Sequence, residues 1–193
     1  MARADLDHLL DRYQGRHPDE IATIDRFRKL LDDDERCFFR DCLPGHFTSS
    51  AWIVSRESGS VLLTHHRKLD RWLQLGGHAD GETDLLASAL REAEEESGLR
   101  DFRAVPRTGV VEILDLDVHE IPARASEPRH QHYDIRFLFE VSDAQRIRRQ
   151  EAESKAIRWF SAEGIENRFV EESLLRMARK ASAWLLRSPA GPA

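Results

Sequence analysis

Apolar residues recur along the chain in two periods, and these periods predict where helices and strands form. Helical spacing at the N-terminus predicts helices at residues 4–14 and 19–43, and the same spacing near the C-terminus predicts a helix at residues 171–186. Between them, shorter apolar runs bounded by turn residues predict extended segments at residues 47–54, 61–64, 72–75, 109–119, 130–141 and 158–160.

One more helix is predicted after Gly81, where the chain breaks. Thr83 is the expected N-cap, and Asp84 lies at the positive end of the helix dipole. Gly98 can adopt the left-handed turn that ends a helix. The apolar positions of this helix are spaced to form one buried stripe, Leu86, Leu90 and Ala93.

The same helix carries an acidic face. Glu92, Glu95 and Glu96 stand at i, i+3 and i+4, so their carboxylates project together and repel one another. A hard cation such as Mg²⁺ would remove this repulsion, because it prefers oxygen ligands. The alternative is a solvated acidic surface with Arg91 as a local counter-charge.

The context of the acidic face resembles the Nudix box. Gly76-Gly77 precedes the helix, and residues 91–99 read Arg-Glu-Ala-Glu-Glu-Glu-Ser-Gly-Leu, which matches every defined position of the second half of that motif. The family's first glutamate would fall on Thr83, whereas the acid here is Glu82, one position earlier. The resemblance covers about residues 46–187. It leaves out an N-terminal helical segment at 1–45 and a tail at 188–193, which is expected to be flexible.

The resemblance implies a fold, a reaction and a cofactor. The fold would be an α/β (α+β) domain in which helices sandwich a mixed sheet, here with an N-terminal helical extension. The protein would be a pyrophosphohydrolase, a hydrolase of acid anhydrides that uses Mg²⁺, or alternatively Mn²⁺, to cleave a diphosphate linkage in a nucleoside diphosphate derivative.

The resemblance also suggests roles for individual residues. Glu92 and Glu96 would be the main metal ligands, with Glu95 and the Gly76 carbonyl as further ligands. One carboxylate, from this helix or from a later loop, would accept the proton of the attacking water. Arg91 would orient the glutamates through its planar guanidinium.

Alternation in the strand predicted at 130–141 places His132, Asp134 and Arg136 on one polar face. We expect this face to line a substrate pocket, with Arg136 on a phosphate and His132 on a base or sugar. His78, next to the box, is a further candidate for substrate contact. An ordinary solvent-exposed face remains the alternative.

Two groups of polar residues carry weaker signals. His119, His130 and His132 flank one predicted hairpin loop, and imidazoles suit transition metals, but without a tight ligand motif scattered surface histidines are favoured. Glu151 and Glu153 precede the last predicted strand, where some Nudix enzymes place an extra metal ligand or base. Surface positions are the favoured interpretation for both.

Composition limits the domain number, the class of partner and the cellular location. The chain has 193 residues, which fits one domain with an accessory segment, and its formal net charge of −6 argues against a nucleic-acid polymer as partner. Cys37 and Cys42 build no disulfide framework, and we find neither a membrane-spanning run nor a secretion signal. The chain is expected to be soluble and cytoplasmic, with a small molecule as its partner.

The N-terminal helices present an apolar stripe formed by Ile21, Ile24, Phe27, Leu30 and Leu31. It must be buried, and the favoured expectation is a homodimer interface, with packing against the chain's own domain as the alternative.

Two other functions stay open at this point. One is a non-catalytic Nudix-like domain that senses a nucleotide, although such domains usually lose glutamates of the box. The other is an enzyme like isopentenyl diphosphate isomerase, whose catalytic cysteine has no counterpart in residues 75–78.

Overall fold

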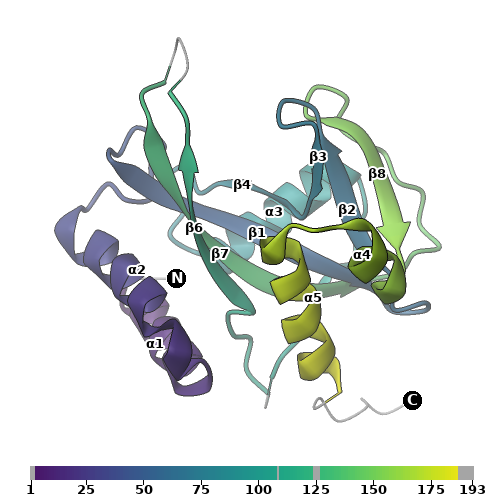
Figure 1. Cartoon of the computed structure of the whole chain (residues 1–193), viewed down its shortest axis with the longest axis horizontal. Helices are drawn as coiled ribbons and strands as arrows, with labels where there is room; N and C mark the ends of the chain where they lie inside the picture. The colour runs from purple at the N-terminus through teal and green to yellow at the C-terminus, as the bar shows by residue number, and fades with distance from the viewer. Residues whose placement is uncertain (1–2, 108, 124–126, 187–193) are drawn as a thin grey trace.

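Two long strands form the centre of the fold. The computed structural model describes residues 3–107, 109–123 and 127–186, so the tail expected at 188–193 lies outside the described residues. Strands β1 (Gly45–Ser55) and β7 (His130–Val141) run parallel and pair along the whole of β1 (Figure 1). Segments that are more than 80 residues apart in the sequence therefore lie side by side.

The other strands extend this pair into one mixed sheet. On the β1 side lie β2 (Val61–His66), β3 (Arg71–Leu73), β4 (Leu75–His78) and β8 (Ser154–Phe160), and on the β7 side lie β5 (Arg103–Ala104) and β6 (Asp115–Ile121). On this side, β1 pairs with β4 at residues 48–51 and with β2 at residues 53–54, so the sheet divides there. Each predicted extended segment contains strand, although the one expected at 109–119 begins only at Asp115 and the one at 72–75 is divided at Gln74 between β3 and β4.

Helices cover both faces of the sheet, as expected for a mixed α+β fold (Figure 1). Helix α3 (Leu85–Ser97) packs on one face, and α4 (Ala162–Arg168) and α5 (Glu172–Leu185) pack on the other. Side chains of β1 point alternately to the two faces of the sheet, so Ile53 packs in the core beneath α3 and Trp52 packs in the core beneath α5. Helix α4 was not predicted.

Helix α3 forms where expected, but the face that it buries differs slightly from the predicted one. Asp84 rather than Thr83 is the N-cap, and its carboxylate accepts the N–H of Ala87 at 3.1 Å. Gly98 ends the helix with φ 69°, as predicted. The fully buried stripe is Leu85, Ala89 and Ala93 rather than Leu86, Leu90 and Ala93. With this face buried, Glu92 and Glu96 turn toward the sheet.

The N-terminal segment forms α1 (Arg3–Arg16), a short 3-10 helix η1 (Pro18–Glu20) and α2 (Ile21–Asp33). The helix expected at 19–43 stops early because Asp34 is extended and its carboxylate accepts the N–H of Arg36 at 2.7 Å, a local bond that competes with helix. Among the helices of the described residues, none has the length and apolarity needed to cross a membrane.

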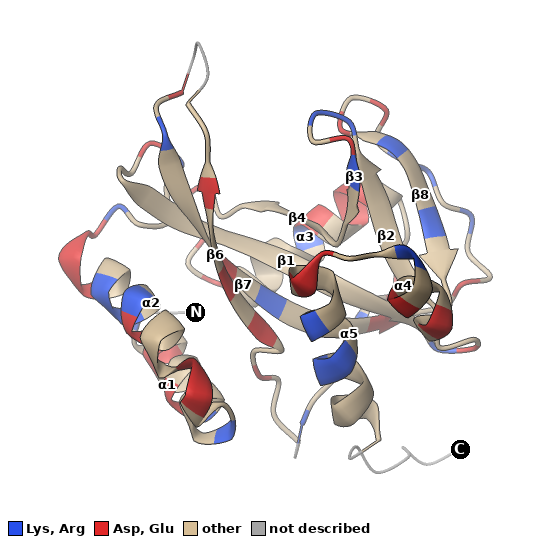
Figure 2. Cartoon of the chain, viewed as in Figure 1, with Lys and Arg blue, Asp and Glu red and all other residues tan. Residues whose placement is uncertain are grey.

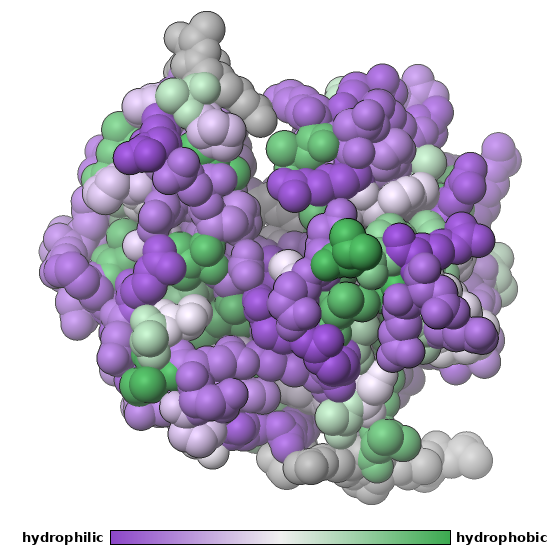
Figure 3. Space-filling view, viewed as in Figure 1, coloured by the Kyte–Doolittle hydropathy of each residue, from purple (hydrophilic) through white to green (hydrophobic). Residues whose placement is uncertain are grey.

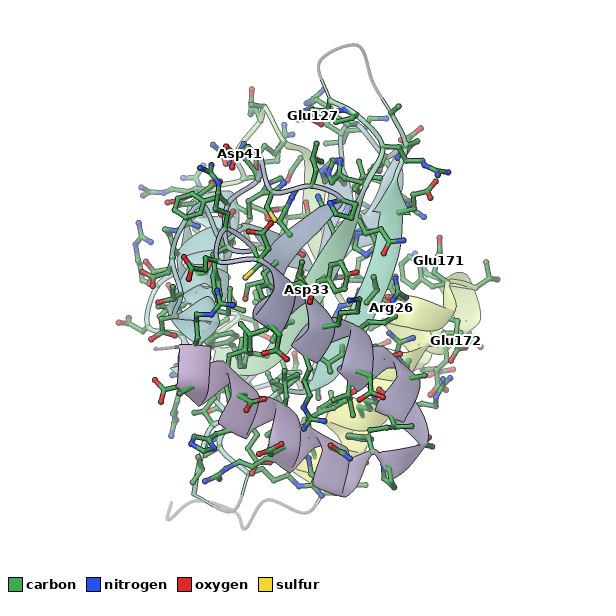
Figure 4. All side chains as sticks on the ribbon, turned by 90° about the vertical axis from the view of Figure 1, so that its left-hand side faces the viewer. Arg26, Asp33, Asp41, Glu127, Glu171 and Glu172 are labelled. Atoms are coloured by element: carbon green, nitrogen blue, oxygen red, sulfur yellow. The ribbon has the colours of Figure 1, made fainter. Side chains whose placement is uncertain are left out.

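The apolar stripe of α2 is buried within the chain itself. Phe27 stacks against Phe47 of β1 at 6.0 Å between ring centroids and meets Tyr133 of β7 edge-on at 5.4 Å. Arg26, labelled in Figure 4, lies over the Tyr133 ring at 5.7 Å. The stripe residues in this core are Ile24, Phe27, Leu30 and Leu31. This burial favours the alternative that the stripe packs against its own domain, and a homodimer that uses this segment stays a prediction.

A buried charge network joins the sheet to the terminal helices, where acidic segments of β6 lie beside basic segments of α5 (Figure 2). Arg136 of β7 is 2% exposed. Its guanidinium contacts three carboxylates, those of Asp134 at 2.8 Å, Asp115 at 2.9 Å and Asp117 at 3.2 Å. Burial alone would lower the pKa of Arg136, but these aspartates raise it above its ordinary value, so the side chain stays charged.

The network continues to the N-terminus through Lys180 of α5. Its ammonium group donates to Asp115 at 2.7 Å, to Glu20 of η1 at 2.5 Å and to the Tyr13 hydroxyl of α1 at 2.6 Å. Tyr13 in turn donates to Glu20 at 2.5 Å. Lys180 thus joins α5 directly to α1 and η1, and also to the buried Asp115 of β6.

The expectation that Arg136 binds a substrate phosphate is wrong in this structure. Its three carboxylate partners, together with the Ser173 hydroxyl at 2.8 Å, occupy the guanidinium inside the protein. The alternation of β7 placed this side chain on the polar face correctly, but that part of the face is covered by α5.

We expect Arg136→Leu to lower the free energy of unfolding by about 3–5 kcal/mol, because it leaves three carboxylates without their shared partner. Chemical denaturation would measure this. The matched control is Arg103→Leu, which removes an exposed pair with Glu140 at 2.9 Å and should cost about 0–1 kcal/mol. Unchanged stability together with a large loss of substrate affinity would restore the phosphate role.

Candidate active site

A cavity of about 480 Å³ opens on one side of the sheet. Its walls come from the β2–β3 hairpin and the β6–β7 hairpin, and its floor comes from β1, β4 and α3. Figure 3 shows the surface hollowed between the two hairpins. The cavity brings together the predicted box residues and the polar end of β7.

The glycine pair lets α3 approach β4 closely. A Cβ atom on Gly77 would lie 2.6 Å from the carboxyl carbon of Glu92. Gly76 has φ 157°, and a Cβ atom there would lie 2.5 Å from the Ser50 hydroxyl of β1. Both positions need glycine, because a side chain on Gly77 would collide with the Glu92 carboxylate and one on Gly76 would collide with β1.

The glutamates of α3 line the cavity to different depths. Glu96 is 4% exposed, and its carboxylate accepts the N–H of Gly76 at 2.9 Å. The Glu92 side chain is 13% exposed and that of Glu95 is 55% exposed. Glu153, in the loop before β8, lines the same cavity.

Arg91 organises the outer part of this group. Its guanidinium contacts Glu92 at 2.7 Å and Glu95 at 3.4 Å, and it donates to the His78 carbonyl at 3.1 Å. The side chain therefore links the helix to the end of β4. This agrees with the orienting role that the family resemblance suggested.

Burial makes the inner carboxylates hard to ionise. The pKa of Glu96 is raised to about 8, mainly by burial and also by the charges of Glu153 and Glu92, against the lowering effect of the hydrogen bond from Gly76. The pKa of Glu92 is also raised by burial, against the lowering effect of Arg91. A divalent cation would favour the ionised forms, so these residues fit the magnesium site implied by the box.

Glu82 does not join this group. Its carboxylate accepts the backbone N–H of Asp84 at 2.7 Å, just before α3 begins. The described lining of the cavity does not include Glu82. The one-residue displacement seen in the sequence thus places this acid at the start of the helix.

The residues predicted to contact the substrate do not all lie in the cavity. His78 and His132 both line the cavity, as does Asp134, whereas Arg136 is buried and does not belong to the lining. Burial lowers the pKa of His78 to about 4 and that of His132 to about 2, so both imidazoles are neutral near pH 7.

Three features of the cavity were missed or undervalued at the level of the sequence. Glu153 was taken for a surface residue. Arg40 and Asp80 form an ion pair at the cavity wall, with Nε of Arg40 2.6 Å from Asp80. His46 lies behind His132 on the next strand. Only Glu153 had a signal, its place in the loop where family members supply an extra acid.

The two cysteines lie elsewhere. Cys37 and Cys42 are both buried in the core that contains α1 and α2, and neither belongs to the described lining of the cavity. The isomerase alternative, which needs a cysteine near the box, therefore finds no support in this geometry.

Comparison with known proteins agrees with this geometry. The family model for the NUDIX domain matches residues 45–184. No curated protein matches the chain.

Several solved structures have the same fold. A NUDIX-family hydrolase from Clostridium perfringens is 27% identical, with a TM-score of 0.54, over 72% of this chain and 97% of that one. An Ap4A hydrolase from C. elegans, in a binary complex, is 16% identical, with a TM-score of 0.56, over the same shares. The NUDIX domain of Shewanella oneidensis NrtR complexed with ADP ribose is 17% identical, with a TM-score of 0.51, over 82% of this chain and 97% of that one.

The raised pKa of Glu96 predicts how the stability of the metal-free protein depends on pH. The unfolded chain releases this proton near pH 4.5, but the folded chain holds it up to about pH 8, so the free energy of unfolding falls as the pH rises through this window. Glu96→Gln removes the titration. With a chelator present, we expect the variant to match the wild type near pH 4.5 and to be more stable at pH 8 by on the order of a few kcal/mol.

Urea denaturation across this pH range measures the effect. Glu94→Gln is the matched control, because Glu94 is on the same helix and pairs with Arg100 at 2.8 Å outside the cavity. A constant difference between Glu96→Gln and wild type at all pH values would contradict the assignment of a buried, protonated Glu96.

Proposed function

The chain belongs to the NUDIX family and is a hydrolase that acts on acid anhydrides, and within that class we propose that it cleaves a diphosphate linkage in a nucleoside diphosphate derivative. A divalent cation, Mg²⁺ or Mn²⁺, would be required. The observation that carries the proposal is the charge at the α3 side of the cavity. Four carboxylates, those of Glu92, Glu95, Glu96 and Glu153, line it with the single guanidinium of Arg91 beside them.

Such an excess of acid suits a cation rather than the diphosphate itself. Glu92 and Glu96 would hold the cation, because they are the deepest carboxylates and stand one helical turn apart. Glu95 and the carbonyl of Gly76 complete the proposed ligand set. When bound, the cation supplies positive charge for the phosphate oxygens and acidifies a bound water.

The remaining groups position the metal-binding carboxylates or accept the proton of the attacking water. The N–H of Gly76 fixes one oxygen of Glu96, and Arg91 fixes Glu92, so both carboxylates are oriented before substrate arrives. Glu95 and Glu153 lie on the open side of the group and are the candidates for accepting the proton of the attacking water.

The upper cavity offers groups for the rest of the substrate. Lys68 on the β2–β3 turn would attract phosphate oxygens. His78 and His132, which are neutral near pH 7, would contribute hydrogen bonds to a base or sugar rather than charge. Among the similar structures, one is named for its action on Ap4A and another contains ADP ribose, which supports a nucleotide derivative as substrate.

A sensing domain without activity is the less favoured function. The glutamates of the box helix are all present, and Glu92, Glu95 and Glu96 line one cavity with their orienting arginine. A domain that only bound a nucleotide would have no use for buried carboxylates whose ionisation the protein itself disfavours.

We expect Glu92→Gln and Glu96→Gln each to lower the turnover number by about 100-fold or more, because each removes a charge that holds the cation. Hydrolysis would be followed with a panel comprising a dinucleoside polyphosphate, a nucleotide sugar, coenzyme A and an oxidised nucleoside triphosphate, with Mg²⁺ or Mn²⁺.

Glu94→Gln serves as the control in this assay as well, since it neutralises a neighbouring glutamate outside the cavity and should retain nearly full activity. Unchanged turnover in both Glu92→Gln and Glu96→Gln would rule out this helix as the metal site.

Glu82→Gln should lower turnover by less than about tenfold, which is weaker than the loss expected for a key electrostatic group. Glu82 contacts the backbone N–H of Asp84, and Gln can still accept that hydrogen bond. The same assay measures it. A loss equal to that of Glu96→Gln would show that Glu82 keeps the role of the family's first glutamate.

A further inference from the structure

Five of the nine histidines in the chain gather on one face of the sheet. The strand register places His46 of β1 opposite His132 of β7, and His132 opposite His119 of β6. His130 follows on the same face of β7, and His78 comes from β4. The rings of His78 and His119 lie 5.0 Å and 5.4 Å from that of His132 between centroids.

Backbone carbonyls fix the tautomers of two of these rings. Nδ1 of His46 lies 3.3 Å from the Cys42 carbonyl, and Nδ1 of His130 lies 2.9 Å from the Pro128 carbonyl. A carbonyl oxygen only accepts, so each Nδ1 carries the proton and each Nε2 presents a lone pair. A histidine that binds a metal through one ring nitrogen usually donates a hydrogen bond from the other nitrogen in this way.

Ring nitrogens of three of these histidines converge on one point. Nε2 of His130 lies 3.2 Å from Nε2 of His132, and the ligand nitrogens of His46, His130 and His132 all lie within 4.8 Å of one another. His46 is 1% exposed, and among the described residues its Nε2 has no hydrogen-bond partner. A buried polar atom without a partner is costly, so its position needs an explanation.

We propose that His46, His130 and His132 bind a divalent transition-metal ion such as Zn²⁺, at a site separate from the carboxylates of α3. Three imidazoles suit zinc and its neighbours, whereas Mg²⁺ prefers oxygen ligands. Tetrahedral ligand nitrogens about 2.0–2.1 Å from zinc would be separated by little more than the distance already found between His130 and His132.

The fourth position of this ion would face the cavity. His130 and His132 line the cavity, while His46 lies behind them and closes the inner side. Three protein ligands with one open position is the pattern of zinc sites that bind a water or a substrate atom. The proposal does not depend on the hydrolase assignment, because it concerns different ligands from different strands.

The test is zinc binding by the full chain in the presence of excess Mg²⁺, which would occupy the carboxylate site. Equilibrium dialysis with metal analysis should give one zinc per wild-type chain. His132→Asn should lower the zinc affinity more than about tenfold. Co²⁺ provides a second readout, since nitrogen ligands in tetrahedral geometry give intense visible absorption that oxygen ligands in octahedral geometry do not.

Two control variants separate the sites. His65→Gln changes a histidine outside the cluster, which pairs with Asp70 at 3.2 Å, and should bind zinc as the wild type does. Glu92→Gln/Glu96→Gln should also retain the zinc while losing activity. His46→Gln should behave as His132→Asn does, and if the buried substitution prevents folding, His132→Asn decides alone.

The proposal is overturned if the wild type binds no zinc in excess Mg²⁺, if His132→Asn binds zinc as tightly as the wild type, or if the zinc is lost in Glu92→Gln/Glu96→Gln. The last result would place the zinc on the carboxylates. None of these outcomes depends on identifying the substrate, so the histidine site and the hydrolase function can fail independently.

Discussion

The close contact between α3 and β4 is the constraint on which the rest of the site depends. Gly77 carries no side chain, so the Glu92 carboxylate can lie against the strand, and the backbone N–H of Gly76 binds the buried Glu96 carboxylate. The Ser49 hydroxyl of β1 donates to the Leu85 carbonyl at 2.5 Å and holds the start of the helix on the other side. A buried carboxylate that faces like charges is unfavourable by itself. The apolar face of α3 offsets this cost by packing into the core, and a cation would remove it.

The protein uses buried acids in two opposite ways. Around Asp115, four carboxylates meet the three cations Arg136, Arg176 and Lys180, so charge is nearly balanced and the cluster holds α5 and the N-terminal helices on the sheet. At the α3 side of the cavity, Glu92, Glu95, Glu96 and Glu153 have one arginine, Arg91, beside them. The residue types are similar, and the number of nearby cations distinguishes the structural cluster from the proposed metal site. This count was not visible in the sequence, because the cations beside Asp115 come from β7 and α5.

Local features were predictable and long-range neighbours were not. The bounds of β7 were predicted to the residue, and the box helix, its acidic face and its end at Gly98 followed from short-range spacing. The phase of α3 was wrong by one position, because periodicity alone could not choose Leu85 over Leu86 as the start of the buried stripe. Arg136 was placed on the correct face of β7 but given the wrong partner, since alternation says nothing of what covers that face. His46 was overlooked because only the parallel pairing of β1 with β7 brings it beside His132.

Strand β7 connects these separate parts of the molecule. Successive positions on its polar face, His132, Asp134 and Arg136, belong in turn to the histidine cluster, the cavity wall and the buried charge network. Asp134 joins the last two, since it contacts Arg136 at 2.8 Å and accepts the Ser50 hydroxyl of β1 at 2.8 Å beside the glycine pair. A shift of one residue in the pairing of β7 would move all three side chains to the opposite face. The charge network around Arg136 therefore does more than stabilise the fold, because it also fixes the register that places the cavity residues opposite β4 and α3.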